Sequence, residues 1–247
     1  MALIRELEKQ GNFLFKYRGQ FPAILFFIAI PFILNTDYLR MNDQYISTTI
    51  YSSIFISTIG FLIRFYTIGT TPKGTSGRNR RNQIADELNS SGLYSLIRHP
   101  LYLGNYLIWI GISMFTINFL FCILISLIFW IYYERIMYAE ERFLEKKFSE
   151  RYILWASKTP AFIPNFIGFK KPKKSFSIIS VLRREYAGML ATVIGFSFID
   201  ILKNYNIYGS WTINFRMLIV LAITIFLVLI LRSLKHYTNL LEEKNRS

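Results

Sequence analysis

Residues 101–133 read LYLGNYLIWIGISMFTINFLFCILISLIFWIYY and contain two long apolar runs, Leu101–Phe115 and Phe119–Tyr133. Only residues 116–118 separate the two runs. Apolar runs of this kind indicate helices in lipid, where every backbone polar group must be satisfied within the element. Because three residues leave no room for a longer connection, the stretch predicts an antiparallel helical hairpin inside a membrane.

Four further apolar runs flank this hairpin: Phe21–Leu34, Ile46–Ile68, Tyr186–Leu202 and Arg216–Leu231. Of the 247 residues, 53% are hydrophobic, which excludes a disordered chain. The formal net charge is nevertheless +14, and the charges are concentrated between the runs. This segregation is typical of a chain whose solvent is the bilayer. The predicted fold class is therefore an all-α, polytopic integral membrane protein with about six transmembrane helices.

The distribution of basic residues predicts the topology. With six spans and both termini in the cytoplasm, 26 of the 29 Lys and Arg lie on the inner side. The outer side keeps only Arg40, Lys203 and Arg216. Arg64, near the end of the second run, is expected to extend its charged end to the interface. The charge is thus explained by membrane topology, and no nucleic acid partner is expected.

Cysteine and histidine are too few for a disulfide framework or a metal centre. Cys122 is the only cysteine, and it lies inside an apolar run. His99 and His236 are separated by most of the chain. We therefore expect neither a disulfide nor a bound metal ion.

The basic stretch FKKPKKS, residues 169–175, is the expected joint between two parts of the chain. Its four lysines suit anionic headgroups. We expect a membrane core over residues 1–170 and a transmembrane extension of two helices over residues 171–247. No oligomeric state is assigned.

The segment 86–104, DELNSSGLYSLIRHPLYLG, concentrates polar residues beside the third run. Pro100 suits the first position of a helix, so the third span is predicted to begin there. Gly104, one turn later, would allow close approach of another helix or of a ligand. Each of these residues on its own can also be explained without a functional site. Arg98 would then be a positive charge on the cytoplasmic side that sets the membrane topology, and His99 would be a helix cap.

The segment that follows the fourth run predicts a cytoplasmic amphipathic helix that lies on the membrane and ends at Pro160. Its apolar positions recur at helical spacing and are Phe143, Leu144, Phe148, Tyr152 and Trp155. Glu141 and Glu145 lie between them and are expected on the solvated face. Glu140 differs, because it falls where the fourth span leaves the bilayer, with Arg135 more than one turn earlier. The two either form an ion pair or bind a cationic and an anionic group of a ligand.

Several short strings follow one another in these segments: Gly92-Leu-Tyr94, Arg98-His-Pro-Leu-Tyr102-Leu-Gly104, Glu140-Glu141-x-x-Leu144, Phe148-x-x-x-Tyr152 and Pro160…Ile163-Pro164. With the short hairpin between them, they resemble the isoprenylcysteine carboxyl methyltransferase family and the related phospholipid methyltransferases. The resemblance runs from Asp86 to Pro164, about a third of the chain. It is specific because order and spacing agree across two separated segments.

The resemblance implies an integral membrane enzyme that transfers a methyl group from S-adenosylmethionine (SAM) to a lipid-linked acceptor in the bilayer. It implies no Rossmann domain, and the sequence has no glycine-rich strand-to-helix turn. Arg98, His99 and Glu140 would be catalytic, and Arg135 would bind the acceptor. Because the wider family has bacterial members, a bacterial inner membrane is expected. The residues implied to line the SAM pocket are Asp86, Glu87, Leu88, Asn89, Tyr94, His99, Pro100, Leu101, Tyr102 and Glu140.

Methyl transfer from a sulfonium requires positioning in a dry site more than acid–base chemistry. An acceptor that is already an anionic oxygen needs no general base and suits an arginine, whereas an amine would have to lose a proton. We therefore expect an O-methyltransferase acting on a carboxylate or a lipid phosphate. Residues 74–81, GTSGRNRR, add three arginines that suit an anionic headgroup or serve only as topogenic charges.

Two other functions fit part of the pattern. NADPH-dependent sterol-type reductases carry a similar Arg-His-Pro-x-Tyr-x-Gly string, usually with Asn before the tyrosine and an acid after the glycine. Here those positions are Leu101 and Asn105. A transporter or membrane scaffold would use Asp200 as an intramembrane ionisable group and would pack helices at Gly188 and Gly195.

Overall fold

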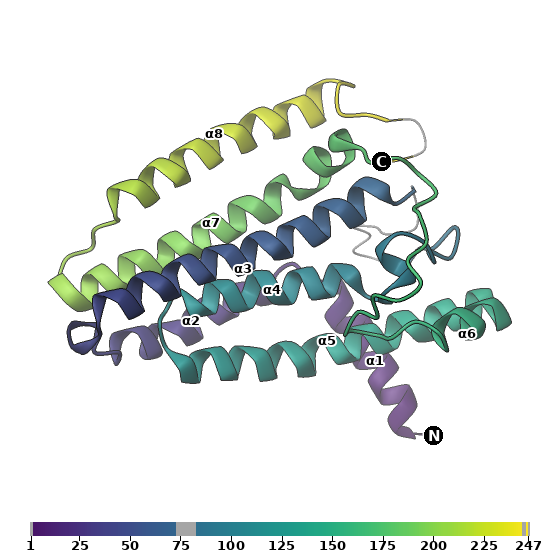
Figure 1. Cartoon of the computed structure of the whole chain (residues 1–247), viewed down its shortest axis with the longest axis horizontal. Helices are drawn as coiled ribbons and strands as arrows, with labels where there is room; N and C mark the ends of the chain where they lie inside the picture. The colour runs from purple at the N-terminus through teal and green to yellow at the C-terminus, as the bar shows by residue number, and fades with distance from the viewer. Residues whose placement is uncertain (1, 73–82, 244–245, 247) are drawn as a thin grey trace.

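The structure is a computed structural model that describes residues 2–72, 83–243 and 246 (Figure 1). The arginine stretch 74–81 lies outside the described residues. The described residues form helices and no strands, which confirms the all-α polytopic prediction. The α-helices are α1 Ala2–Tyr17, α2 Phe21–Leu34, α3 Asp43–Thr70, α4 Pro100–Met114, α5 Phe119–Phe148, α6 Glu150–Ala156, α7 Ile178–Tyr208 and α8 Phe215–Tyr237.

Four of these helices, α3, α5, α7 and α8, are long and apolar enough to cross a membrane. The other two predicted spans are shorter, with 14 residues in α2 and 15 in α4. At 1.5 Å per residue these helices are about 21–23 Å long, less than the hydrocarbon core of about 30 Å. The six helices nevertheless run in alternating directions along one bundle (Figure 1). Six spans remain a prediction, in which α2 and α4 are the short ones.

The predicted hairpin is formed by α4 and α5. Pro100 is the first residue of α4, as expected. The Asn118 side chain accepts a hydrogen bond of 3.0 Å from the Phe121 amide, which caps the start of α5. Tyr38 donates a hydrogen bond of 2.8 Å to the Thr116 carbonyl and ties the hairpin turn to the segment before α3. Both helices of the hairpin therefore begin where the sequence predicted, α4 at Pro100 and α5 at Phe119.

The boundaries predicted for the amphipathic helix were wrong. The first part of that segment continues α5, and the last part forms the short helix α6. α5 continues without a break through Tyr133 to Phe148, and its 30 residues are about 45 Å long. The residues after Tyr133 are good helix formers without glycine or proline, so the helix propagates beyond the bilayer. Ser149 interrupts it with a φ of 47°, a left-handed conformation that favours glycine, and α6 follows.

The helices α3 and α4 cross at Gly60 and Gly104. A Cβ atom on Gly104 would lie 2.8 Å from the Gly60 carbonyl oxygen and 2.6 Å from Arg64 Cγ. These separations are too short for a real side chain, so the two backbones approach more closely than any other residue pair would allow. The predicted role of Gly104 in close helix packing is confirmed.

We expect Gly104→Val to destabilise the protein by about 1–3 kcal/mol, because the added side chain forces α3 and α4 apart. Thermal unfolding in detergent, followed by loss of helical circular dichroism, measures this change. Gly19→Ala is the matched control, since a Cβ there meets nothing within 4 Å. An equal loss in both variants would contradict the packing argument.

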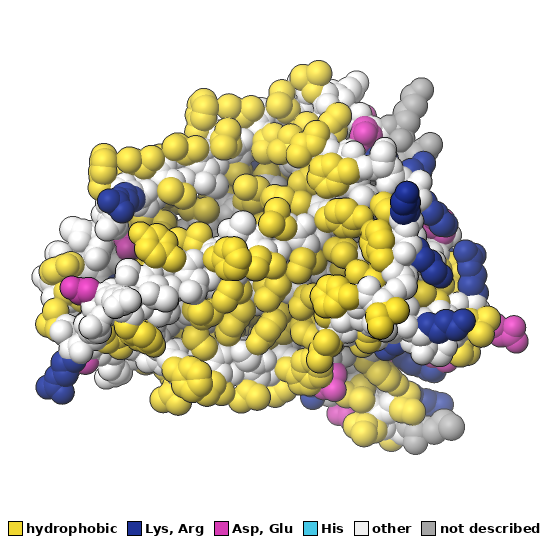
Figure 2. Space-filling model, in the orientation of Figure 1, with side chains coloured by type: hydrophobic (Ala, Val, Ile, Leu, Met, Phe, Trp, Pro, Cys, Tyr) yellow, Lys and Arg dark blue, Asp and Glu magenta, His cyan; other side chains and the backbone are white. Residues whose placement is uncertain are grey.

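The C-terminal helices form one side of the bundle. α7 packs against α2, α3 and α4, and α8 packs on α7 (Figure 1). Most of the apolar surface of α8 is exposed, as expected for a helix that faces lipid. In Figure 2 apolar side chains cover the middle of the molecule, and Lys and Arg gather mainly at the end where α1 and α6 lie. This polar end carries the candidate site.

Candidate active site

A cavity of about 420 Å³ lies at the polar end of the bundle, between α1, α3, α4, α5, α7 and the loop that precedes α4. Asp86 is exposed on that loop, and Pro100 is buried in the first turn of α4. Neither residue lines the cavity. The predicted site residues that do line it are Glu87, Leu88, Asn89, Tyr94, Arg98, His99, Leu101, Tyr102 and Glu140. The structure therefore brings together most of the residues that the motifs indicated.

The loop before α4 is held in place by the segment that follows α6. The Arg98 amide donates to the Pro160 carbonyl at 2.8 Å, and the His99 amide donates to the Ala161 carbonyl at 3.2 Å. The Trp155 indole donates to the Tyr94 carbonyl at 3.1 Å. These bonds fix the backbone of the loop against α6 and the segment after it, and the Arg98 and His99 side chains reach Glu141 of α5.

Glu141 is the centre of this contact, and its predicted place on a solvated face was wrong. Arg98 Nε and Nη2 donate to its two carboxylate oxygens at 2.8 and 3.3 Å. His99 Nε2 lies 2.8 Å from Oε1 of the same group. The cause is the unbroken α5, which carries this residue directly beneath the loop. His99 is at the N-cap of α4, but its side chain makes no capping bond.

Glu140, the neighbouring carboxylate, has fewer contacts. Tyr102 donates a hydrogen bond of 2.8 Å to Glu140 Oε2, and His99 Nδ1 lies 3.7 Å from the same oxygen. A third of its side chain stays exposed, and it lines the cavity. Both glutamates line the cavity, but Glu141 is bonded to Arg98 and His99 of the loop, whereas Glu140 makes fewer contacts.

We expect Glu141→Gln to lower the free energy of unfolding by about 1.5–3 kcal/mol, because the Arg98 guanidinium loses its charged partner. Thermal unfolding in detergent measures the change. Glu145→Gln serves as the control. Among the described residues Glu145 pairs only with Arg142, in a more exposed ion pair, and exposed pairs contribute about 0–1 kcal/mol. A Glu141 variant as stable as the control would show that the loop is held without this pair.

Sequence reasoning missed the polar network that lines the membrane side of the cavity. Arg64 does not extend to the interface as expected. Its Nε and Nη2 atoms each lie 2.7 Å from a carboxylate oxygen of Glu185, whose side chain is only 2% exposed. Arg64 also donates to Asn105 Oδ1, and the Asn105 amide donates to the Tyr133 hydroxyl at 3.0 Å. The one available signal was a charged residue inside an apolar run, which normally has a buried partner.

Aromatic side chains form much of the cavity wall, including Tyr94, Tyr102, Tyr152 and Trp155. Burial, followed by the nearby Glu140 carboxylate, raises the pKa of the Tyr94 phenol above its usual value. Burial, followed by Glu141, likewise raises the pKa of Tyr152. Both phenols therefore stay neutral at physiological pH. The Tyr152 hydroxyl is buried and has no hydrogen-bond partner among the described residues.

Three further cations also line the cavity, and the motifs did not reveal them. They are Lys16 at the end of α1, Arg18 in the turn after α1, and Arg184 on α7. Arg18 donates a hydrogen bond of 2.8 Å to the Phe15 carbonyl and lies 3.8 Å over the Phe15 ring. The cavity therefore combines carboxylates from α5 with the guanidinium groups of Arg18, just after α1, and of Arg184 on α7.

Arg135 does not line this cavity. Its Nε donates to Gln10 Oε1 at 2.9 Å, and its Nη1 donates to the Ile131 carbonyl at 2.8 Å. Five residues separate it from Glu140, which places the two about 140° apart around α5. The predicted acceptor-binding residue therefore faces a different part of the molecule.

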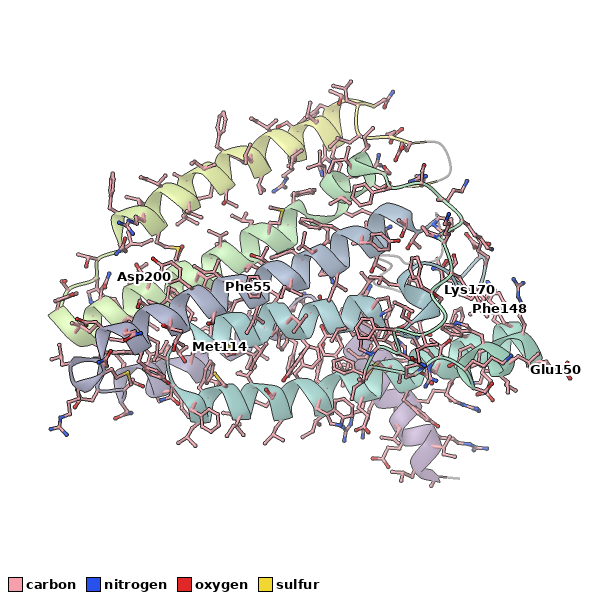
Figure 3. The ribbon with its side chains drawn as sticks, viewed as in Figure 1. Phe55, Met114, Phe148, Glu150, Lys170 and Asp200 are labelled. Atoms are coloured by element: carbon pink, nitrogen blue, oxygen red, sulfur yellow. The ribbon has the colours of Figure 1, made fainter. Side chains whose placement is uncertain are left out.

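Asp200, the intramembrane acid considered for a transporter, lies far from the cavity. Figure 3 shows it toward the opposite end of the bundle from Phe148 and Lys170. Its carboxylate accepts a hydrogen bond of 2.7 Å from the Asn214 amide, in the connection between α7 and α8. Among the residues that the structure describes, no group of three or more His, Cys, Asp or Glu is placed to hold a metal ion.

The chain is similar in sequence to several known proteins. The chain is 27% identical over 121 residues to protein-S-isoprenylcysteine O-methyltransferase of Schizosaccharomyces pombe, covering 47% of this chain and 51% of that protein. It is 33% identical over 86 residues to protein-S-isoprenylcysteine O-methyltransferase B of Arabidopsis thaliana, covering 34% and 43%. It is also 29% identical over 155 residues to the cobalt-zinc-cadmium resistance protein CzcN of Cupriavidus metallidurans, covering 62% and 66%.

These alignments have limited extent, and the chain spans about half the length of the S. pombe protein. No solved structure matches the chain. Residues 48–151, which hold most of α3, all of α4 and α5, and the loop motif, match the phospholipid methyltransferase family. The resemblance that the motifs carry is therefore confirmed: over this region the chain is similar to the phospholipid methyltransferases and, at low identity, to isoprenylcysteine methyltransferases.

Proposed function

We propose that this protein is a membrane methyltransferase that uses SAM to methylate an anionic oxygen of a lipid-linked acceptor. The observation that carries the proposal is the position of Glu140. Its carboxylate lines a cavity walled by Tyr94 and Tyr102, at the polar end of a bundle that matches the phospholipid methyltransferases. A partly exposed carboxylate beside aromatic faces suits a ligand that carries an ammonium group and a sulfonium.

The cavity residues fit SAM on three points. Glu140 offers a carboxylate to the ligand's amino group, and aromatic faces favour a cationic sulfur. The buried Tyr152 hydroxyl, which lacks a partner among the described residues, offers a hydrogen bond to a ligand. When bound, SAM supplies the methyl group that moves from sulfur to the acceptor oxygen. The residues proposed to hold it are Glu87, Leu88, Asn89, Tyr94, His99, Leu101, Tyr102 and Glu140.

Arg98 acts in this proposal as a positioning residue. It binds Glu141 and the carbonyls of Ala156 and Thr159 at 2.9 and 2.8 Å, so its donors are directed toward the loop and α6. Glu141 in turn holds the His99 ring, whose other nitrogen faces Glu140. This chain of contacts orients Glu140 and His99 before any ligand binds, which is the main requirement for an in-line displacement.

The acceptor class follows from two arginines, one in the turn after α1 and one on α7. Arg184 and Arg18 line the same cavity as Glu140 and would hold a carboxylate or phosphate oxygen. An anionic oxygen needs no general base, whereas these arginines would oppose binding of a protonated amine. We assign the acceptor role to Arg184 and Arg18 in place of Arg135.

The same end of the bundle carries α1, the C-terminal end of α8 and most of the basic loops (Figure 1). By the positive-inside rule this end lies in the cytoplasm, with the cavity at headgroup depth. We propose an integral protein of a bacterial inner membrane with both termini cytoplasmic. In this proposal α7 and α8 extend the region that matches the family, residues 48–151, and α7 forms one wall of the site.

The test is calorimetric titration of the detergent-purified protein with SAM and, separately, with NADPH. We expect micromolar binding of SAM and none of NADPH. Transfer of labelled methyl from SAM into a bacterial lipid extract then identifies the acceptor. Mild base releases carboxyl methyl esters, and fragmentation mass spectrometry of the base-resistant lipid distinguishes a methyl phosphate from a methylated amine. Binding of NADPH without SAM would overturn the proposal in favour of a reductase. Label that resists base on a lipid amine would overturn the acceptor class.

A further inference from the structure

A second cavity, of about 720 Å³, lies between α1 and α5 and shares no lining residue with the candidate active site. Its wall is apolar, formed by side chains that include Phe13, Leu14, Ile128 and Ile131. Phe13 is 62% exposed and Ile131 is 54% exposed, so the wall opens outward instead of closing into a core. We call this feature the α1–α5 groove.

The groove lies at the depth where lipid headgroups meet acyl chains. α5 starts at Phe119, at the end of the bundle opposite the active site. Arg135 lies 16 residues later, about 24 Å along the helix, near the edge of a hydrocarbon core of about 30 Å. Ile128 and Ile131 lie one to two turns deeper. The polar end of the groove is therefore at the interface, and its apolar wall extends toward the membrane interior.

The polar end of the groove carries an excess of positive charge. Lys9 and Arg135 line it together with one carboxylate, that of Glu6. Glu6 accepts a hydrogen bond of 3.2 Å from Gln10. Both hydrogen bonds of Arg135 go to neutral oxygens, on Gln10 and Ile131. Among the described residues Arg135 bonds to these two oxygens and forms no ion pair with a carboxylate, so its charge is available to an anion from outside the protein.

We propose that the α1–α5 groove binds one anionic diacyl phospholipid of the bilayer, distinct from the methyl acceptor. Its phosphate lies at Lys9 and Arg135, and an acyl chain covers the apolar wall. Charge complementarity selects an anionic over a zwitterionic headgroup. The apolar wall selects a lipid over a free phosphate, because only an acyl chain removes that surface from water.

Binding at this groove also affects the active site, because α1 forms a wall of both. Gly11 on α1 lies against α5, where a Cβ would come within 2.1 Å of the Arg135 carbonyl oxygen. Tyr132 donates a hydrogen bond of 3.1 Å to the Leu14 carbonyl. A lipid held between the same two helices keeps α1 docked, and with it the Arg18 side chain that lines the active-site cavity.

The experiment is native mass spectrometry of the full-length protein released from detergent micelles and titrated with dioleoyl phosphatidylglycerol or dioleoyl phosphatidylcholine. We expect the wild type to retain one phosphatidylglycerol and no phosphatidylcholine at matched concentration. The double variant K9Q/R135Q should bind phosphatidylglycerol roughly 30-fold more weakly, since two interfacial cations are lost. Arg135→Lys, which keeps the charge, should weaken binding by less than about tenfold.

The matched control is K147Q/K158Q, which removes two exposed lysines, one near the end of α5 and one after α6, that line neither the groove nor the active-site cavity. We expect it to retain phosphatidylglycerol as the wild type does. Equal retention by K9Q/R135Q, or an equal loss in the control, would overturn the proposal, because binding would then depend on total charge. Displacement of the lipid by glycerol 3-phosphate alone would overturn it too.

Lysine 9 is exposed on α1, so the single variant Lys9→Gln keeps the test valid if the double variant does not fold. It should lose roughly fivefold in affinity, and unchanged binding would contradict the assigned headgroup position. Lipid retention is measured without SAM. A failure of the methyltransferase proposal therefore leaves this result standing, and a failure here leaves SAM binding unaffected.

Discussion

Replacing Glu140 by glutamine is expected to weaken SAM binding by roughly 10- to 100-fold, which corresponds to the loss of one charge-assisted hydrogen bond of about 1.5–3 kcal/mol. The carboxylate lines the cavity and keeps a third of its surface exposed, so its charge is available to a ligand. Titration calorimetry on the wild type and the variant measures the ratio of dissociation constants.

The same substitution should leave the fold intact. A glutamine side-chain oxygen still accepts the hydrogen bond from Tyr102, so we expect the melting temperature to stay within about 2 °C of the wild type. Glu145→Gln is the binding control, because Glu145 does not line the cavity. If Glu140→Gln bound SAM as the wild type does while remaining folded, the ligand's amino group would not lie at this carboxylate.

The largest effect on stability is expected for Glu185→Ala. This change leaves Arg64 within the helix bundle without the carboxylate that binds two of its nitrogens. Breaking a buried pair on one side costs about 3–5 kcal/mol, because an uncompensated charge remains away from water. Unfolding of the purified protein in mixed detergent micelles, followed by circular dichroism, measures the loss.

Two further variants test whether the loss of stability comes from the unpaired Arg64 charge. The double variant Arg64→Met/Glu185→Met removes both charges, so we expect it to be clearly more stable than Glu185→Ala. Glu242→Ala breaks the more exposed pair with Arg183 and should cost no more than about 1 kcal/mol. A double variant as unstable as Glu185→Ala would show that the cost comes from lost packing, not from an unpaired charge.

The helical architecture could be predicted because lipid permits few alternatives. An apolar run in a bilayer must satisfy its backbone within the segment, so the runs of this chain predict helices directly. The hairpin followed from a connection of three residues and the start of α4 from Pro100. The limit of this reasoning lies at Ser149, where the break between α5 and α6 depends on a single positive φ that no apolar pattern reveals.

The candidate site could be predicted where its residues are close in sequence. Tyr94, His99 and Tyr102 belong to one loop and one helix start, so an ordered string was enough to locate them. Glu140 was placed by its position at the end of a span. Glu141 was misplaced, because its role depends on the loop that α5 meets, and that meeting is a property of packing.

The sequence by itself determined the membrane class, the helices and the end of the bundle where the candidate site lies, because these follow from local hydrophobicity, helix-start signals and charge placement. Only the tertiary structure decided which side chains share the cavity. Arg64 and Glu185 pair across 121 residues, and Arg135 turns away because α1 packs on its side of α5. Such contacts depend on how each helix is rotated about its own axis. Successive side chains on a helix point about 100° apart, so a shift of one position changes which neighbour a side chain meets.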